Sequence, residues 1–256
     1  MIRLKTKEEI EILRENALLV SKTLAEVGKN IEPGVTTLKL NEIAESYIRD
    51  NGAQPAFLGY GGFPFTLCIS VNDVIVHGFA SDYRLKEGDI ISVDCGTVYK
   101  GFYGDSAYTF SVGNIDTDTA NLLKVTKESL YLGIDAATIG NRIGDISYAV
   151  QNHAESNGYS VVREMVGHGI GKQLHESPEV PNYGKRGSGK KLVEGMVICI
   201  EPMINAGTRS VKIHKDGWTL STNDGKNSAH FELMVAITKE GPEVLSTFDY
   251  IEKNNI

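Results

Sequence analysis

A short segment occurs twice in this chain at a long separation, and this repeat restricts the folds that the chain can adopt. Residues 85–94 read LKEGDIISVD and residues 192–201 read LVEGMVICIE. The two segments share Leu, Glu, Gly and one Ile at equivalent positions, and they end in acids 107 positions apart, Asp94 and Glu201. The repeat favours two halves related by a pseudo-twofold axis, with both acids close to that axis.

Each half begins with two helical patterns and continues with strand-like ones. Residues 6–9, TKEE, have the spacing of a capping box, and Asn-Gly helix stops recur at residues 51–52 and 157–158, 106 positions apart. We predict one helix that begins after Thr6 and three more at about 38–50, 117–137 and 144–156. The clearest predicted strands are 67–76, 90–99, 102–110 and 231–238. Helices grouped before strands favour an α+β fold, with an antiparallel sheet core and helices outside.

The last two strands predicted in the first half are separated only by Lys100 and Gly101 and read as a hairpin. A two-residue turn there pairs Asp94 with Ala107, so that Asp105 is a diagonal neighbour of Asp94 on the same face. Two carboxylates this close repel each other unless one keeps its proton or a cation lies between them.

Glu201 and Glu232 are two further acids in apolar runs, where a carboxylate is costly unless it is paired or bound to a metal. Any one of these acids could be a solvated residue on an amphipathic strand. Four of them in two related hairpins favour a single acidic cluster. Carboxylate oxygens suit hard divalent ions such as Mn²⁺, Fe²⁺ or Co²⁺ better than a structural zinc. Two ions bridged by shared carboxylates are the expected geometry for hydrolysis.

Three histidines have a context that favours a functional role. His77 lies at the end of an apolar strand and precedes a glycine, His168 lies in the segment GHGIG at 167–171, and His175 follows seven residues later. Glycine permits a close backbone approach or an unusual φ. A lone histidine is more often a satisfied core or surface residue. We apply that interpretation to the remaining three, His153, His214 and His230.

Composition and charge exclude several classes of protein. The chain is 41% hydrophobic and 23% charged, as an ordinary globular protein is, and its net charge of −7 offers no basic footprint for nucleic acid. The N-terminus, MIRLK, lacks the apolar core of a signal peptide, and no apolar run is long enough to span a bilayer. We interpret the cysteines as buried, inert thiols in a reducing compartment: Cys68, Cys95 and Cys199. We therefore expect a cytoplasmic protein with neither nucleic-acid nor membrane partners.

Seven short motifs occur in order along the chain: 76–78 (VHG), 93–96 (VDCG), 104–107 (GDSA), 167–171 (GHGIG), 175–176 (HE), 200–203 (IEPM) and 231–232 (FE). Together they resemble the type I methionine aminopeptidases, in the form without an N-terminal extension. Any single motif is weak, but seven in order are specific, and the resemblance covers essentially the whole chain. It implies a pita-bread fold with internal pseudo-twofold symmetry. It also implies one catalytic domain over 1–256, with halves of about 1–113 and 114–256.

The resemblance further implies an activity and the residues that perform it. The family removes the initiator methionine from nascent polypeptides when the second residue is small. Two divalent ions (Co²⁺, Mn²⁺, Fe²⁺ or Zn²⁺) would be held by Asp94, Asp105, His168, Glu201 and Glu232, with Asp105 and Glu232 bridging. Glu201 is also placed to move a proton, and His77 and His175 would contact the substrate. The methionine pocket would be lined by Tyr60, Phe63, Cys68 and Trp218.

Four positions depart from the family pattern. Leu174 replaces an aromatic residue, Gly61 and Leu233 each replace a histidine, and His230 replaces a glutamine. We expect none of them to touch a metal ligand, so they should affect fine specificity rather than the reaction. We expect a monomer that acts on the N-terminal methionine of nascent chains, and the sequence leaves open a location close to the ribosome.

Two other readings remain. Proline-specific enzymes of the same fold usually carry a further N-terminal domain, whereas this chain begins directly with the catalytic-type helices. A creatinase-like enzyme, a further enzyme of this fold, needs no metal ligands, and here all five are present. The second reading is a non-catalytic peptide-binding protein that kept the fold; such proteins typically lose ligands, so the intact set argues against it.

Overall fold

The computed structural model describes residues 2–253 and agrees with the α+β prediction. Capping side chains determine where helices begin: the Thr6 hydroxyl accepts from the Glu9 N–H, Glu9 reaches back to Thr6, and Asp116 caps the third helix. None of the helices in the described part of the chain is long and apolar enough to cross a membrane. The helices are α1 (Lys7–Gly28), α2 (Thr37–Asp50), α3 (Thr117–Asp135), α4 (Ile143–Ser156), a 3₁₀ turn at Tyr60–Gly62 and α5 (Asp249–Glu252).

The strands form two larger and two smaller sheets. In the first half they are β1 (Gln54–Pro55), β2 (Leu67–Val71), β3 (Val74–Val76), β4 (Ile90–Tyr99) and β5 (Phe102–Ser111). In the second half they are β6 (Ser160–Val161), β7 (Gly167–Gly169), β8 (Glu176–Val180), β9 (Val197–Ile200), β10 (Met203–Asn205), β11 (Val211–Ile213), β12 (Leu220–Thr222), β13 (Ser228–His230), β14 (Leu233–Thr238) and β15 (Gly241–Val244).

Two predicted strands need correction. The single strand predicted at 67–76 is two strands, β2 and β3, because Asn72 turns the chain with a φ of 54°. The Asn72 side chain stabilises this turn by accepting from the Ile90 N–H and donating to Asp89. The strand predicted at 231–238 begins only at Leu233. Glu232 instead forms an isolated bridge with Ala107 of β5, which joins the two halves.

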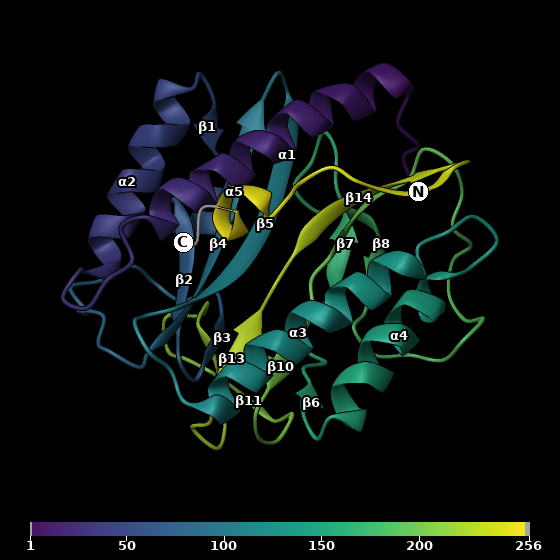
Figure 1. Ribbon diagram of the computed structural model, residues 1–256. Coiled ribbons are helices and arrows are strands. Elements are labelled where there is room, and N and C mark those ends of the chain that lie inside the picture. Colours follow the sequence, from purple (N-terminus) through teal and green to yellow (C-terminus); the bar gives the residue numbers. More distant parts are fainter. Residues whose placement is uncertain (1, 254–256) are drawn as a thin grey trace.

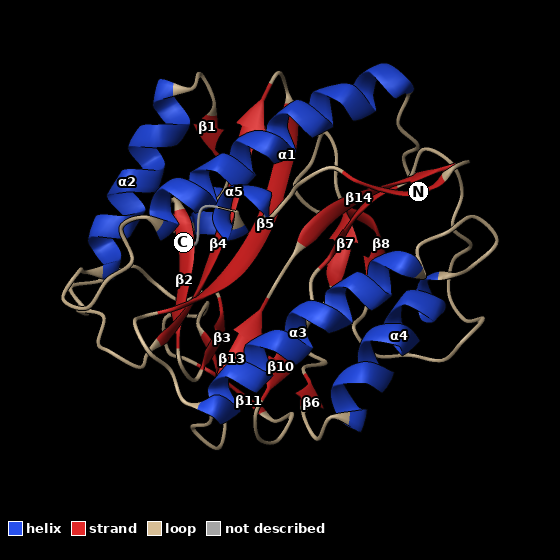
Figure 2. Ribbon diagram, viewed as in Figure 1, coloured by secondary structure: helices blue, strands red, loops and turns tan. Residues whose placement is uncertain are grey.

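The two larger sheets are antiparallel and contain the hairpin that the sequence predicts. One has the order β1-β4-β2 with β5 on β4, and the other has the order β15-β14-β9-β7-β8. The observed register pairs Asp94 with Ala107, which confirms the two-residue turn. Helices α1 and α2 lie over the first sheet, and α3 and α4 lie over the second and over the small sheet β13-β10-β6, so each half repeats a helix pair on strands (Figure 1). Strands β5 and β14 run through the space between the α1–α2 pair and the α3–α4 pair (Figure 2).

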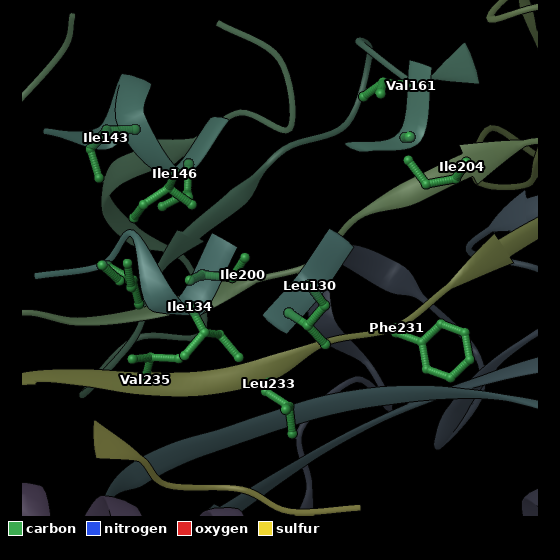
Figure 3. Close-up of a cluster of buried hydrophobic side chains, with 14 of the residues drawn as sticks. Leu130, Ile134, Ile143, Ile146, Val161, Ile200, Ile204, Phe231, Leu233 and Val235 are labelled. Atoms are coloured by element: carbon green, nitrogen blue, oxygen red, sulfur yellow. The ribbon is translucent and has the colours of Figure 1, made fainter. Parts of the chain in front are cut away.

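A hydrophobic core under α3 and α4 holds the second sheet in place (Figure 3). Leu130 and Ile134 of α3 pack in the same cluster as Ile200 and Leu233, which are paired neighbours on β9 and β14. Each such side chain contributes roughly 1.5–3 kcal/mol when fully buried. Because Ile200 precedes one predicted acid and Leu233 follows another, this packing fixes where those acids leave the sheet. Leu233, a departure from the family pattern, is thus a core residue.

Candidate active site

A cavity of about 210 Å³ opens between the two halves and is lined by every site residue that the sequence predicts. Acids and histidines form one part of its wall, and aromatic and sulfur-containing side chains form another. The predicted residues that it brings together are Tyr60, Phe63, Cys68, His77, Asp94, Asp105, His168, His175, Glu201, Glu232 and Trp218.

The four acids reach the cavity from four different strand positions. Asp94 lies on β4 and Asp105 on β5, where Asp105 is opposite Gly96. Glu201 directly follows β9, and Glu232 is held by the bridge to Ala107, with its carbonyl accepting a 2.6 Å hydrogen bond from Ser106 Oγ. Two acids therefore come from each half of the chain, as the repeat predicts.

Burial makes this acidic cluster energetically unfavourable without a cation. Burial raises the pKa of Asp94 to about 7, and it raises the pKa of Asp105, Glu201 and Glu232 well above the ordinary range, with further contributions from the neighbouring carboxylates. One oxygen each of Asp94, Asp105 and Glu232 is buried without a hydrogen-bond partner. Buried, unpartnered carboxylate oxygens that face one another suit divalent cations, which would stabilise the ionised form.

His168 presents a nitrogen to the same cluster. Its Nδ1 lies 2.9 Å from the Gly169 carbonyl, so that Nδ1 carries the proton and Nε2 is left as an acceptor. This Nε2 lies 3.5 Å from Glu201 Oε1 and 3.8 Å from Asp105 Oδ2. Burial, followed by the neighbouring His175, lowers the pKa of His168 to about 4, so the ring is neutral at physiological pH. A neutral imidazole with a free Nε2 is the form that binds metals.

The glycines around His168 act through close backbone contact, as the sequence predicts. A Cβ atom at Gly167 would lie 2.4 Å from the Cys199 carbonyl oxygen, and one at Gly169 would lie 2.5 Å from the Ser177 carbonyl oxygen. Any side chain at either position would force β7 away from its neighbours. The glycines therefore let His168 enter the cavity from a strand in the interior of the sheet.

His77 and His175 lie on the side of the cavity next to its apolar part. The Tyr60 hydroxyl lies 2.9 Å from His175 Nδ1, and the His168 and His175 rings meet edge to face with centroids 4.4 Å apart. His77 has a positive φ of 57°, an unusual conformation that turns the chain at the end of β3. Burial, then the neighbouring His175, lowers the pKa of His77 to about 4. Both rings thus lie beside the acids without being part of the acidic cluster.

The apolar part of the cavity is built from the predicted pocket residues. The Phe63 and Trp218 rings meet edge to face with centroids 5.2 Å apart, and Cys68 pairs with Asp94 across β2 and β4. Leu174, one of the departures, also lines the cavity. Gly61 lies behind Trp218, because a Cβ there would be 3.2 Å from the indole ring.

The comparisons with known proteins agree with this geometry. The pattern of metallopeptidase family M24 matches residues 11–239. The chain belongs to this family. Methionine aminopeptidase from Clostridium acetobutylicum is 51% identical over 247 residues, which are 96% of this chain and 99% of the relative. Methionine aminopeptidase 1 from Bacillus subtilis is 49% identical over 246 residues, with the same coverages.

Solved structures confirm the pita-bread fold that the resemblance implies for this M24 metallopeptidase. The crystal structure of methionine aminopeptidase from Thermotoga maritima superposes with a TM-score of 0.95 at 44% identity, covering 96% of this chain and all of that one. Prolidase from Pyrococcus horikoshii, at 24% identity, shares the fold with a TM-score of 0.78, and this chain covers 63% of it.

One histidine prediction is wrong. His153 and His214 do pair, with Glu128 and Ser221 respectively, as expected of satisfied residues. His230 instead lines the cavity, its Nε2 is buried without a hydrogen-bond partner, and that nitrogen lies 3.9 Å from Glu201 Oε2. Burial, then His77, lowers the pKa of His230 to about 3. His230 thus comes close to Glu201, a predicted ligand, although the 3.9 Å between them is too long for a hydrogen bond.

Sequence reasoning also missed several residues that complete the cavity. They are Phe57, Val76, Met165, Val166 and Met203. All three cysteines are buried and free, as predicted. Cys199 packs against the acidic cluster, with its sulfur within 4.8 Å of possible ligand atoms of Asp105, His168 and Glu232.

Proposed function

We propose that this M24 metallopeptidase is a methionine aminopeptidase, which removes the initiator methionine from nascent polypeptides when the second residue is small. The observation that carries the proposal is a single cavity in which an acid and histidine cluster adjoins an apolar, sulfur-containing pocket. The similarity to methionine aminopeptidases over 96% of the chain supports the same activity.

The proposed metal ligands are the five residues whose donor atoms converge on the acidic part of the cavity. Their chemistry fits two divalent ions, with Asp105 and Glu232 as the bridging carboxylates, and Co²⁺, Mn²⁺, Fe²⁺ and Zn²⁺ all suit carboxylate and imidazole donors. Such ions would supply Lewis-acid activation of water and of the peptide carbonyl. The proposed set is Asp94, Asp105, His168, Glu201 and Glu232.

Glu201 is the proposed proton carrier. Its carboxylate lies at the end of β9 with both oxygens directed toward imidazoles, His168 and His230. There it can take a proton from the attacking water and later give it to the leaving amine, which one group must do in each turnover.

His175 and His77 are the proposed substrate contacts. If the Tyr60 hydroxyl donates to His175 Nδ1, the imidazole proton is on Nε2, where it can stabilise the developing oxyanion. His77 is neutral above a pKa of about 4 and can hold the scissile amide by a hydrogen bond. Both roles need only a correctly oriented donor, and burial keeps both rings uncharged.

The apolar part of the cavity is the proposed methionine pocket. Tyr60, Phe63, Cys68 and Trp218 offer aromatic edges and a sulfur contact, which suit a flexible thioether side chain. The acidic part attracts the free α-amino group of the substrate. An enzyme that binds this group and the first side chain together cuts only after the first residue.

The proposed setting follows from this substrate. The halves 1–113 and 114–256 each supply two acids, so we propose that they act as one catalytic domain. We further propose that the protein acts as a monomer in the cytoplasm, close to the ribosome, where nascent N-termini emerge. The proposed macromolecular partner is the nascent polypeptide, with neither nucleic acid nor membrane involved.

The test is a comparison of two peptide classes on purified protein. We expect Met-Ala-Ser to be cleaved after Met in the presence of Mn²⁺ or Co²⁺, with activity lost in a chelator and restored by added metal. Xaa-Pro peptides should be cleaved far more slowly. Preferential cleavage of Xaa-Pro would assign a proline-specific activity instead, and peptide binding without cleavage at any metal would assign a binding protein.

A further inference from the structure

His230 differs from the other histidines of the described chain. The His230 side chain is 2% exposed. Five buried side-chain polar atoms of residues 2–253 have no hydrogen-bond partner, and His230 Nε2 is the one imidazole nitrogen among them. Three of the other four such atoms are carboxylate oxygens of Asp94, Asp105 and Glu232 in the same cavity. A buried nitrogen with no partner costs free energy unless something binds it there.

The backbone holds His230 rigidly in this position. It lies on β13, paired with Met203 of β10. Its N–H donates to Thr109 Oγ1 at 3.0 Å, and its carbonyl accepts from the same hydroxyl at 2.7 Å. The backbone position of His230 in the cavity wall is therefore fixed, and its Nε2 lies there without a hydrogen-bond partner.

Glu201 lies between two imidazoles. Its Oε1 is 3.5 Å from His168 Nε2, and its Oε2 is 3.9 Å from His230 Nε2. The second distance is too long for a hydrogen bond, yet it matches the 3.8 Å between His168 and Asp105. Two ligand atoms on one zinc-like ion can be up to about 4.2 Å apart, since each bond is about 2.0–2.2 Å long. The 3.9 Å between His230 Nε2 and Glu201 Oε2 is within that limit, so one ion could bind both atoms.

We propose that His230 is an added nitrogen ligand to the ion that Glu201 binds. Imidazole suits Zn²⁺, Fe²⁺ and Ni²⁺, whereas Mn²⁺ prefers oxygen. An extra imidazole therefore shifts the preference of the centre away from Mn²⁺ and toward Zn²⁺ and Co²⁺, which lie above Mn²⁺ in the usual order of affinities. This inference rests on the proposed metal centre and goes beyond its five ligands.

The test measures metal affinity in His230→Gln and in a matched control, His214→Gln, whose imidazole pairs with Ser221 outside the cavity. Glutamine keeps a polar group near the position of Nε2 but removes the imidazole nitrogen. We expect His230→Gln to weaken Zn²⁺ binding by about 10–100-fold, a loss on the scale seen when the support of a metal site is removed. Mn²⁺ binding should weaken by only about threefold or less, and His214→Gln should leave both affinities unchanged.

X-ray absorption at the zinc edge tests the wild-type protein directly, even if the variant fails to fold. With both sites loaded, His168 and His230 together predict about one imidazole per zinc, whereas His168 alone predicts about one half. A count of one half, or a His230→Gln variant with an unchanged ratio of Zn²⁺ to Mn²⁺ affinity, would overturn the proposal.

Asp105→Asn separates this failure from failure of the proposed function. If Asp105→Asn loses metal while His230→Gln binds as the wild type does, only the role of His230 is wrong. If neither substitution changes metal binding, the proposed metal centre is wrong, and the inference is wrong with it.

Discussion

Replacing Asp105 with asparagine should stabilise the metal-free protein while abolishing its activity. Asp105 is 3% exposed, and its carboxyl lies against those of Asp94 and Glu232, which raise its pKa together with burial. Asparagine has nearly the same shape, removes the negative charge, and can still donate a hydrogen bond to Asp94. The substitution therefore relieves repulsion in the metal-free cluster and would remove a proposed bridging ligand from the metal-loaded one.

The magnitude follows from the spacing of the ligand atoms. Those of Asp105 and Glu232 lie within 4.8 Å of each other. Two unit charges at that distance repel by about 3–4 kcal/mol at an effective dielectric constant near 20. Because partial protonation already relieves part of this repulsion, we expect Asp105→Asn to raise the free energy of unfolding by about 1–3 kcal/mol in chelator. That corresponds to an increase in Tm of roughly 2–10 °C.

Thermal unfolding at pH 8, with chelator and with saturating Mn²⁺, measures the effect. Asp89→Asn is the matched control, because Asp89 is also a buried acid but accepts hydrogen bonds from Asn72, Tyr83 and the Lys86 N–H. That control should lose about 1–3 kcal/mol. Added Mn²⁺ should raise the Tm of the wild type and have much less effect on Asp105→Asn. A lower Tm for Asp105→Asn than for the wild type in chelator would refute the electrostatic reasoning.

Three further outcomes follow from the site. His77→Ala should lower kcat/KM by about two to three orders of magnitude, the scale of one lost transition-state donor, with metal content unchanged by elemental analysis; loss of metal would contradict its substrate-side role. Leu174→Phe should change the inhibition constants of methionine analogues more than kcat, and unchanged constants would remove Leu174 from the pocket. Burial raises the pKa of Asp94 from an ordinary 3.8 to about 7. Between about pH 4 and 7, Asp94 therefore keeps a proton in the folded protein that it has released in the unfolded chain. The metal-free protein should therefore lose stability as pH rises through that window. The Mn²⁺ affinity measured by calorimetry should rise over the same window, and an affinity independent of pH would contradict the raised pKa.

The parts of the site that depend on local geometry could be predicted from the sequence. The two-residue turn at Lys100 and Gly101 fixes the register of β4 and β5, and this register alone brings Asp94 and Asp105 to one face. The internal repeat then placed Glu201 near the first pair. For the hairpin, a short stretch of chain determines the outcome, so periodicity and turn chemistry are sufficient. Glu201 could be placed only because the repeat implied that the two halves are related by a pseudo-twofold axis.

The rest depends on contacts between distant segments. Glu232 meets the other acids through its bridge to Ala107, a contact that no strand pattern specifies. Asn72 breaks a run that reads as one continuous strand, because its side chain has partners around residues 89–90. His230 did leave a signal, since it lies two positions before Glu232 and extended chain places such residues on the same side. Its lack of a partner became visible only in the folded cavity.

Anomalous diffraction from a crystal of the protein loaded with Mn²⁺ would locate the proposed metal centre. We expect two manganese peaks between the two halves that are held together by the side chains of Asp94, Asp105, His168, Glu201 and Glu232, with only Asp105 and Glu232 within bonding distance of both. Manganese bound elsewhere, or a cavity with no anomalous signal at saturating metal, would contradict the account.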